Sequence, residues 1–400
     1  MGDEDAVTIQ IELLKKMREE LEVDGEIEKI VLKNVAQIKN IFNELPLINY
    51  YPIDSTTGKF TDYEEVLEIF IRTNSGGTIL NKSDLMFSLI KLNWANAEEE
   101  FEDLINSLNG NGAFYFDKDF ILKTALVVIE KGARYQVEKF KGSQGEKNLA
   151  AVQNNWQRIL NSFNYLDDFL VYARITSDYL LPSYNALISI AYFAYIHNCK
   201  ADSAKVKYNM QTWLYKTLLN ANFSGQSDTI IDGCVDVIRN YSKADYFPYK
   251  ELETNMKNRR RTVDVNFDTI DKNPYIILTL LYLFNNQIVN FQPKLNGNVP
   301  EIDHIFPRSK MLRAPYEYPH GLVNNIGNYM FLEKSLNISK ANLLPEDYFP
   351  QALKEKPDFY ERYLIPNEPR LHKPENFEDF VNKRRDGIFK TVKGILLYRD

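Results

Sequence analysis

The segment from 299 to 349 decides how this 400-residue chain is interpreted: VPEIDHIFPRSKMLRAPYEYPHGLVNNIGNYMFLEKSLNISKANLLPEDYF. Residues 302–305 alternate between apolar and polar, as a short strand does when one face meets a site, and the prolines on either side keep that strand short. Residues 324–328 (NNIGN) have the composition of a turn, and residues 329–332 (YMFL) form a second apolar run. Residues 335–340 (SLNISK) then open a helix. The segment predicts a strand, a loop, a second strand and a helix, in that order.

Side chains suited to phosphodiester hydrolysis fall on this pattern. The reaction needs a base that deprotonates water and a cation that absorbs charge on the leaving oxygen. His304, with an ordinary pKa of about 6.5, can accept a proton near neutral pH. Asp303 and Asn337 offer hard oxygen donors, which suit Mg²⁺ or Mn²⁺ better than Zn²⁺. We expect Asn328 to orient the imidazole through a hydrogen bond, and Lys340 to contact a phosphate oxygen.

Each of these residues also has an ordinary structural explanation. An Asp-His pair often lies at a sheet edge, an asparagine-rich loop is usually a turn, and Asn337 can cap a helix. Neighbouring strand residues point to opposite sides, so Asp303 and His304 serve one site only if the strand bends there. The prediction therefore depends on the joint spacing of the residues.

That joint spacing resembles the ββα-metal nuclease motif of the HNH family. In that motif a strand carries the Asp-His pair, as at Asp303 and His304, and a loop carries an asparagine, as at Asn328. A helix supplies a further oxygen donor, as Asn337 does nine residues later. The resemblance implies a small metal-dependent nuclease fold.

A second signature lies at residues 70–85, FIRTNSGGTILNKSDL. It resembles the closing segment of the ParB-like N-terminal domain in GmrSD-type modification-dependent restriction enzymes, which carry an HNH domain at their other end. That family places an Asp-Gly-Gln-Gln-Arg run upstream, and this chain has none. NTP hydrolysis is therefore not predicted: either the chain is a piece of a longer protein, or this member has lost that half. Arg72, Asn74, Gly76 and Gly77 form either a structural loop or a contact to a nucleotide or DNA phosphate.

Composition limits how the chain could bind nucleic acid. The formal net charge is −7, so contact with DNA requires a local basic patch rather than a generally basic surface. The candidate nucleic-acid-binding residues are Lys257, Arg259, Arg260, Arg261, Arg308 and Arg385. The alternative interpretation is that these basic residues form solvated helix ends and bind no nucleic acid.

The two cysteines and the lack of long apolar runs indicate the compartment. Cys199 and Cys234 belong to no CxxC pair, which predicts neither a disulfide framework nor a zinc cluster and fits a reducing cytosol. No apolar run reaches membrane-spanning length, so we expect a cytoplasmic protein without a membrane anchor.

The predicted fold class is mainly α, an irregular multi-helix domain carrying a small ββα-metal motif near the C-terminus. We divide the chain into the end of a ParB-like domain (1–94), a helical connecting domain (95–294) and an HNH nuclease domain with closing helices (295–400). Helical periodicity predicts helices at 98–108, 119–132, 154–163, 184–197, 207–219, 275–284, 348–364 and 377–397. Of the other histidines, we expect His197 to pack within a helix and His320 and His372 to lie on the surface.

Together these features predict a Mg²⁺- or Mn²⁺-dependent HNH endonuclease that cuts DNA, and the GmrSD resemblance implies modified phage DNA as the target. Two alternatives stay open. One is a catalytically silent DNA-binding or sensor module, and the other is an RNase or a nickase. A single HNH site cuts one strand at a time, so double-strand cleavage would need a homodimer or a partner half. The sequence leaves open the modification that is read, the physiological metal and any control by nucleotide.

Overall fold

The computed structural model describes residues 11–12, 15–16, 18–19, 25–41, 82–110, 112–140, 142–175, 177–285, 301–332, 337 and 340–399. The chain divides by its contacts into two compact units, Met1–Ile79 and Leu80–Asp400. Arg72, Asn74, Gly76 and Gly77 of the second signature lie outside the described residues. Residues 94 and 294 both fall within the second unit, and the domain boundaries placed there remain predictions.

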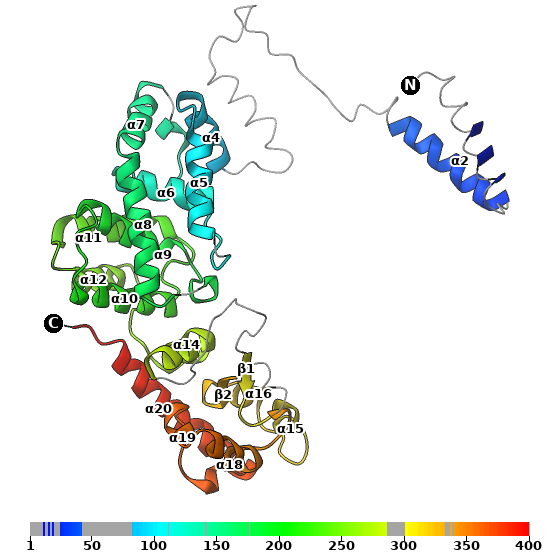
Figure 1. The fold of residues 1–400 in the computed structure, drawn as a ribbon, viewed down its shortest axis with the longest axis vertical. Coiled ribbons are helices and arrows are strands. Elements are labelled where there is room, and N and C mark those ends of the chain that lie inside the picture. The colour runs from blue at the N-terminus through cyan, green and yellow to red at the C-terminus, as the bar shows by residue number, and fades with distance from the viewer. Residues whose placement is uncertain are drawn as a thin grey trace, which may run out of the picture. The chain divides into compact units, whose positions relative to one another are not determined.

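The first unit contains helix α2 (Gly25–Lys39), within the charged N-terminal region (Figure 1). Its apolar residues recur at helical spacing, and Ile27, Ile30 and Ile38 are all exposed.

The N-terminal part of the second unit is a helical assembly built around α9 (Asn185–Ile196). All ten residues from Ala186 to Tyr195 are buried, as expected for a helix that is apolar on every side. Helices α6, α8, α10 and α11 pack against it. The other helices of this part are α4 (Lys82–Asn93), α5 (Ala97–Asn109), α6 (Lys118–Val128), α7 (Gly142–Asn154), α8 (Trp156–Tyr172), α10 (Ala204–Leu219), α11 (Ser227–Tyr241) and α12 (Tyr249–Asn258). Helices α13 (Phe267–Lys272) and α14 (Pro274–Asn285) follow, and α14 packs against the C-terminal part of the unit. The predicted mainly helical character is confirmed, and each helix predicted between residues 98 and 284 has a counterpart.

The C-terminal part of this unit holds the one sheet of the described residues. Strand β1 (Glu301–His304) pairs antiparallel with β2 (Tyr329–Leu332), with Asp303 opposite Met330 and His304 opposite Tyr329. Short helices α15 (Arg308–Met311), α16 (His320–Val323) and the 3₁₀ turn η5 (Ile326–Asn328) connect the strands. Both strands lie where the sequence predicts them. Of the predicted helix at 335–340, only Asn337 and Lys340 are described, and both are helical.

Helices after the sheet close the domain. They are α18 (Pro345–Glu355), α19 (Phe359–Arg362) and α20 (Phe377–Ile395), with the 3₁₀ turns η6 (Pro369–His372) and η7 (Pro374–Asn376) before α20. The single helix predicted at 348–364 is wrong, because the chain breaks between α18 and α19 at Pro357, which has no backbone N–H to donate. The surface location predicted for His372 is also wrong. It is buried against Phe349, and its Nε2–H donates to the carbonyl of Pro366, 2.8 Å away.

Arg384 of α20 anchors the loop between the two strands. Its side chain is 1% exposed, and it donates hydrogen bonds to the backbone carbonyls of Ile326, Gly327 and Tyr329 at 2.7–3.2 Å and to that of Tyr363 at 3.1 Å. Burial lowers the pKa of Arg384 to about 9. The buried arginine thereby fixes η5 and the start of β2 on α20.

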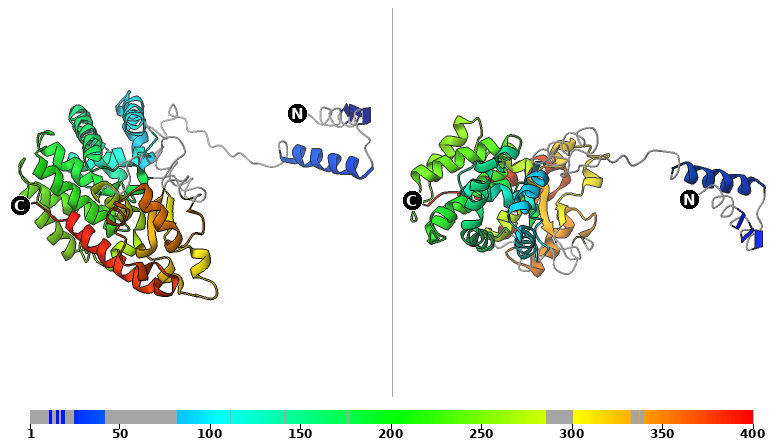
Figure 2. Two further views of the ribbon diagram at one scale, coloured as in Figure 1. Left: turned by 60° about the horizontal axis from the view of Figure 1, so that its bottom comes forward. Right: turned by 90° about the horizontal axis from the view of Figure 1, so that it is seen from above.

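The segment after α20 returns to the helical part of the unit (Figures 1 and 2). Asn209 of α10 holds Arg399 by two hydrogen bonds, from Nδ2 to the carbonyl (2.9 Å) and from the backbone N–H to Oδ1 (2.8 Å). Tyr398 stacks on Tyr249 of α12 at 3.9 Å between ring centroids, and its hydroxyl donates to Glu253. This C-terminal strap (396–399) joins α20 to α10 and α12. Among the described residues, none of the helices is both long enough and apolar enough to cross a bilayer.

Candidate active site

The end of β1 opens into a pocket of about 500 Å³. His304 is the last strand residue, and the chain bends at once after it, so Asp303 and His304 line the same pocket despite their alternation along the strand. The condition stated from the sequence, a bend at this point, is therefore met. The remaining lining residues are Pro307, Arg308, Ser309, Leu312, Arg313, Ala341 and Asn342.

Asp303 and Lys340 form a buried ion pair beside this pocket. Lys340 is 1% exposed, and its Nζ lies 2.7 Å from Asp303 Oδ2 and donates to the carbonyl of His304 at 2.8 Å. Burial raises the pKa of Asp303, and the nearby ammonium offsets only part of that effect. We predicted that Lys340 contacts a phosphate, but in the structure its ammonium is buried and paired with Asp303 instead.

His304 is held by Asn324, a residue that the spacing argument did not select. Its Nε2 lies 3.0 Å from Asn324 Oδ1, and its ring meets Tyr329 edge-on with 4.9 Å between centroids. Burial lowers the pKa of His304 and outweighs the opposing influence of Asn324 and Asp303. The imidazole is therefore biased toward its neutral form, which is the form that can accept a proton.

Asn328 has a different partner from the one predicted. Its side chain is fully buried, accepts from the backbone N–H of Phe306 at 2.8 Å, and donates to the carbonyls of Phe306 and Val323. The predicted hydrogen bond to His304 is replaced by these backbone contacts. Asn328 thus fixes the chain that follows His304, while Asn324 contacts the ring itself.

Asn337 lies beside the acidic side of β1. Its Nδ2 donates to Glu301 Oε2 at 2.7 Å, and Glu301 precedes Asp303 by two positions, which places both carboxylates on one face of the strand. Asp303 Oδ2 is buried and lies 2.7 Å from the ammonium of Lys340. The oxygen atoms of Asp303, Glu301 and Asn337 are donors of the kind that a hard divalent cation prefers, and among the described residues no three His, Cys, Asp or Glu side chains gather around one cation position. Glu301 is a candidate donor that the sequence argument missed.

Arginines at the rim of the pocket carry its positive charge. Arg308 and Arg313 are both exposed, and neither makes an ion pair with an acidic side chain of the described residues. Arg308 was selected from the sequence, and its charge acts on the pKa of His304. Arg313 was missed, since nothing in the local pattern shows that the loop returns it to the same pocket.

The other candidate basic residues lie elsewhere. Lys257, Arg259, Arg260 and Arg261 are at the end of α12, which packs with α10 and α11 away from the sheet (Figure 1). Arg259 donates to Asn255 and Arg261 to the carbonyl of Ser224, whereas Lys257 and Arg260 are exposed.

Arg385 is also occupied by a contact within the protein. It forms a two-point ion pair with Asp271 of α13 and lies over the ring of Phe267. Its neighbour Lys383 pairs with Glu368. In this structure Arg385 therefore links α20 to α13.

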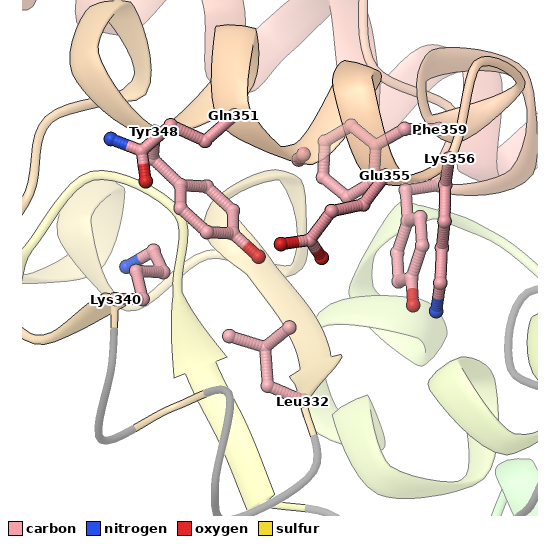
Figure 3. Close-up of a pocket in the computed structure, with 9 residues that line it drawn as sticks. Leu332, Lys340, Tyr348, Gln351, Glu355, Lys356 and Phe359 are labelled. Carbon is pink, nitrogen blue, oxygen red and sulfur yellow. The ribbon is translucent and has the colours of Figure 1, made fainter.

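A second, smaller cavity of about 80 Å³ is lined in part by Lys340 (Figure 3). Tyr348 and Glu355 of α18 point their polar ends into it, and Leu332 of β2 faces them. Burial raises the pKa of Tyr348 to about 12. Lys340 therefore lines this cavity and also pairs with Asp303, which lines the pocket that contains His304.

Comparison with known proteins gives one family. Residues 247–390 match the family described as GmrSD restriction endonucleases, C-terminal domain. The match includes both strands, the pocket and most of α20, and it does not include residues 70–85, so the ParB-like resemblance there remains a prediction. No curated protein matches the chain. The segment from 247 to 390 is therefore similar to the C-terminal domains of GmrSD restriction endonucleases.

Proposed function

We propose that this chain is an HNH-type endonuclease that hydrolyses phosphodiester bonds of DNA in a restriction system. The observation that carries the proposal is the pocket at the end of β1. Within a segment similar to a restriction endonuclease domain, it combines a neutral-biased histidine, a buried carboxylate and two arginines that make no ion pair with the described acidic residues.

His304 is the general base in this proposal. A neutral imidazole can take a proton from the attacking water, and the burial of His304 keeps it neutral near physiological pH. Arg308 and Arg313 bind the phosphate, because guanidinium groups pair with phosphate oxygens through two parallel hydrogen bonds. Lys257 of α12 and Arg260, two residues after its end, are exposed and remain candidates for contacts along the DNA backbone.

Asp303 and Asn337 would hold Mg²⁺ or Mn²⁺, with Glu301 as a further donor. When bound, such a cation stabilises negative charge on the leaving oxygen. Lys340 keeps the Asp303 carboxylate in place and compensates its charge inside the protein. Asn328 holds the chain that follows His304.

Plasmid cleavage in the presence of Mg²⁺ or Mn²⁺ tests the proposal. The parent chain is expected to convert supercoiled plasmid to nicked or linear product, with His304→Ala and Asn337→Ala inactive. His320→Ala is the matched control, since His320 is exposed and does not line the pocket. Equal cleavage by parent, His304→Ala and Asn337→Ala would contradict the assignment of the site.

Cleavage of three substrates distinguishes a restriction nuclease from a nickase and an RNase. A plasmid, phage DNA with modified bases and a structured RNA are compared under the same conditions. Preference for the modified DNA supports a restriction function, and preference for RNA would overturn the DNA assignment. Nicking without linear product would indicate that both strands are cut only when a second site is supplied by another copy or a partner.

A further inference from the structure

The loop from 324 to 328 contains three asparagines, and each has a different partner. Asn325 accepts a hydrogen bond from the backbone N–H of Gly327 at 2.9 Å and so shapes the turn. Asn328 binds the backbone of Phe306 and Val323. Asn324 alone of the three contacts the imidazole of His304, with 3.0 Å between Oδ1 and Nε2.

The position of Asn324 is fixed from both sides. Its backbone N–H donates to the carbonyl of His320 at 2.9 Å, which ties it to the end of α16. On the other side, the Asn328 contacts and the three carbonyl hydrogen bonds of Arg384 hold the rest of the loop. A side chain on such a supported loop can hold its partner in one orientation.

The chemistry of the contact determines which ring nitrogen of His304 is free. An amide oxygen only accepts hydrogen bonds, so the Nε2 that faces it carries the proton. In the neutral ring, Nδ1 then holds the lone pair. Tyr329 packs edge-on against the same ring and limits its rotation. The ring is therefore constrained in both tautomer and orientation.

We propose that Asn324 is the positioning residue of the catalytic histidine: it keeps the proton on Nε2 so that Nδ1 accepts the proton of the attacking water. This inference rests on the proposed nuclease function of the pocket. Asn324 acts through His304 and contacts no substrate. Partners of this kind typically contribute 10- to 100-fold to activity, by orienting the group that does the chemistry.

The kinetic test compares Asn324→Ala, Asn324→Asp and Asn325→Ala in metal-dependent DNA cleavage. Asn324→Ala is expected to lower kcat by about 10- to 100-fold with KM little changed, because Arg308 and Arg313 still bind the phosphate. Asn324→Asp retains an oxygen acceptor and is expected to recover most of kcat. Asn325→Ala perturbs the same turn without touching the ring, so a loss that came only from loop distortion would be as large in this variant.

The spectroscopic test reads the hydrogen bond directly, with ¹⁵N-labelled histidine and no metal present. The parent chain and Asn324→Asp are expected to show a slowly exchanging imidazole N–H resonance from His304, identified by its absence in His304→Gln. Asn324→Ala is expected to lose it, while thermal unfolding shows that the variant is folded. Persistence of the resonance in Asn324→Ala would overturn the inference.

The outcomes distinguish this inference from the proposed function. If the parent chain does not cut, or His304→Ala cuts equally well, the nuclease proposal fails and the inference falls with it. If the parent cuts, His304→Ala does not, and Asn324→Ala cuts at the full rate, only the role of Asn324 is refuted. Failure of Asn324→Asp to recover activity above Asn324→Ala would also refute it.

Discussion

Lys340 is unusual among the charged residues of this chain because its ammonium is inside the protein. Its Nζ lies between the carboxylate of Asp303 and the carbonyl of His304, and the side chain is 1% exposed. A buried charge is tolerated when it is paired and costs several kcal/mol when its partner is removed. The ion pair therefore ties together the strand that carries the site and the helical residues that follow β2.

Replacement of Lys340 by Met should leave Asp303 buried without its counter-ion. We expect the free energy of unfolding to fall by about 3–5 kcal/mol, as is typical when one partner of a buried ion pair is lost. The measurement is urea-induced unfolding in EDTA, so that no divalent cation replaces the ammonium.

The control removes both charges together. A chain with Lys340→Met and Asp303→Leu should be more stable than Lys340→Met alone, because an apolar pair has no uncompensated charge. If the single variant unfolds at the same urea concentration as the parent, the ion pair contributes nothing to stability.

Several site residues could be predicted from the sequence because they lie on short strands or at fixed spacing along one segment. Asp303 and His304 were identified in this way, and the structure brings them together in one pocket. Asn324 could not be separated from Asn325 and Asn328 by spacing, since all three suit a turn. Which of them meets His304 depends on the path of the loop through α15 and α16, and that path is set by packing rather than by local composition.

At the scale of elements, the close packing of η5 on α20 determines how precisely the loop is held. A Cβ added to Gly327 would lie 2.2 Å from the carbonyl oxygen of Val381 in α20, a distance that no real contact allows. Glycine at this position lets the two backbones approach closely, and the Arg384 hydrogen bonds are made across the same contact.

Gly327→Ala should force η5 away from α20. Overpacking of this kind typically costs about 1–3 kcal/mol, and the loop that bears Asn324 would move with it. We expect a lower midpoint of thermal unfolding together with lower DNA cleavage.

Gly321→Ala is the matched control for Gly327→Ala. It lies in α16, and a Cβ there meets nothing within 4 Å. Because alanine is favoured over glycine inside helices, this variant should be as stable as the parent or slightly more stable. Equal stability of both alanine variants would show that the contact with α20 can relax without cost.

The elements themselves were largely predictable, and the exceptions have local causes. The apolar runs predicted both strands, and helical periodicity predicted the long helices. The break between α18 and α19 was missed because the apolar pattern continues across Pro357, although the ring interrupts the backbone hydrogen bonds. The sequence shows that residues 257–261 and 383–385 are basic, but it does not show which acidic residues pair with them. The partner of Arg385, for example, is Asp271, which lies far away in the sequence.

At the scale of the whole second unit, the C-terminal strap links α20 to α10 and α12, and no sequence pattern predicted this contact. It brings residues 396–399 onto α10 and α12, with Asn209 satisfying both backbone groups of Arg399. The predicted division into a helical part and a nuclease part says nothing about this contact, because the contact is made between residues about 190 positions apart.

Asn209→Ala should release the strap from α10. The loss of two hydrogen bonds is expected to lower the free energy of unfolding by about 1–3 kcal/mol and to speed amide exchange at Arg399. Hydrogen exchange measured by NMR or mass spectrometry reads both effects. The comparison variant is Asn258→Ala, which replaces an exposed asparagine on the neighbouring α12. Unchanged protection at Arg399 in Asn209→Ala would mean that the contacts of Tyr398 and the packing of Arg399 on Tyr208 hold the strap without Asn209.

The anchoring of the strand-connecting loop by Arg384 also has a consequence for biosynthesis. Chains leave the ribosome from their N-terminal end, so β1, η5 and β2 emerge before α20. Arg384 follows Ile326 by 58 residues, which corresponds to about 3–12 s of translation at about 5–20 residues per second. For those seconds three carbonyls of the loop lack their donor. The nascent domain therefore completes the support of its histidine late, at a time set by the order of elements along the chain.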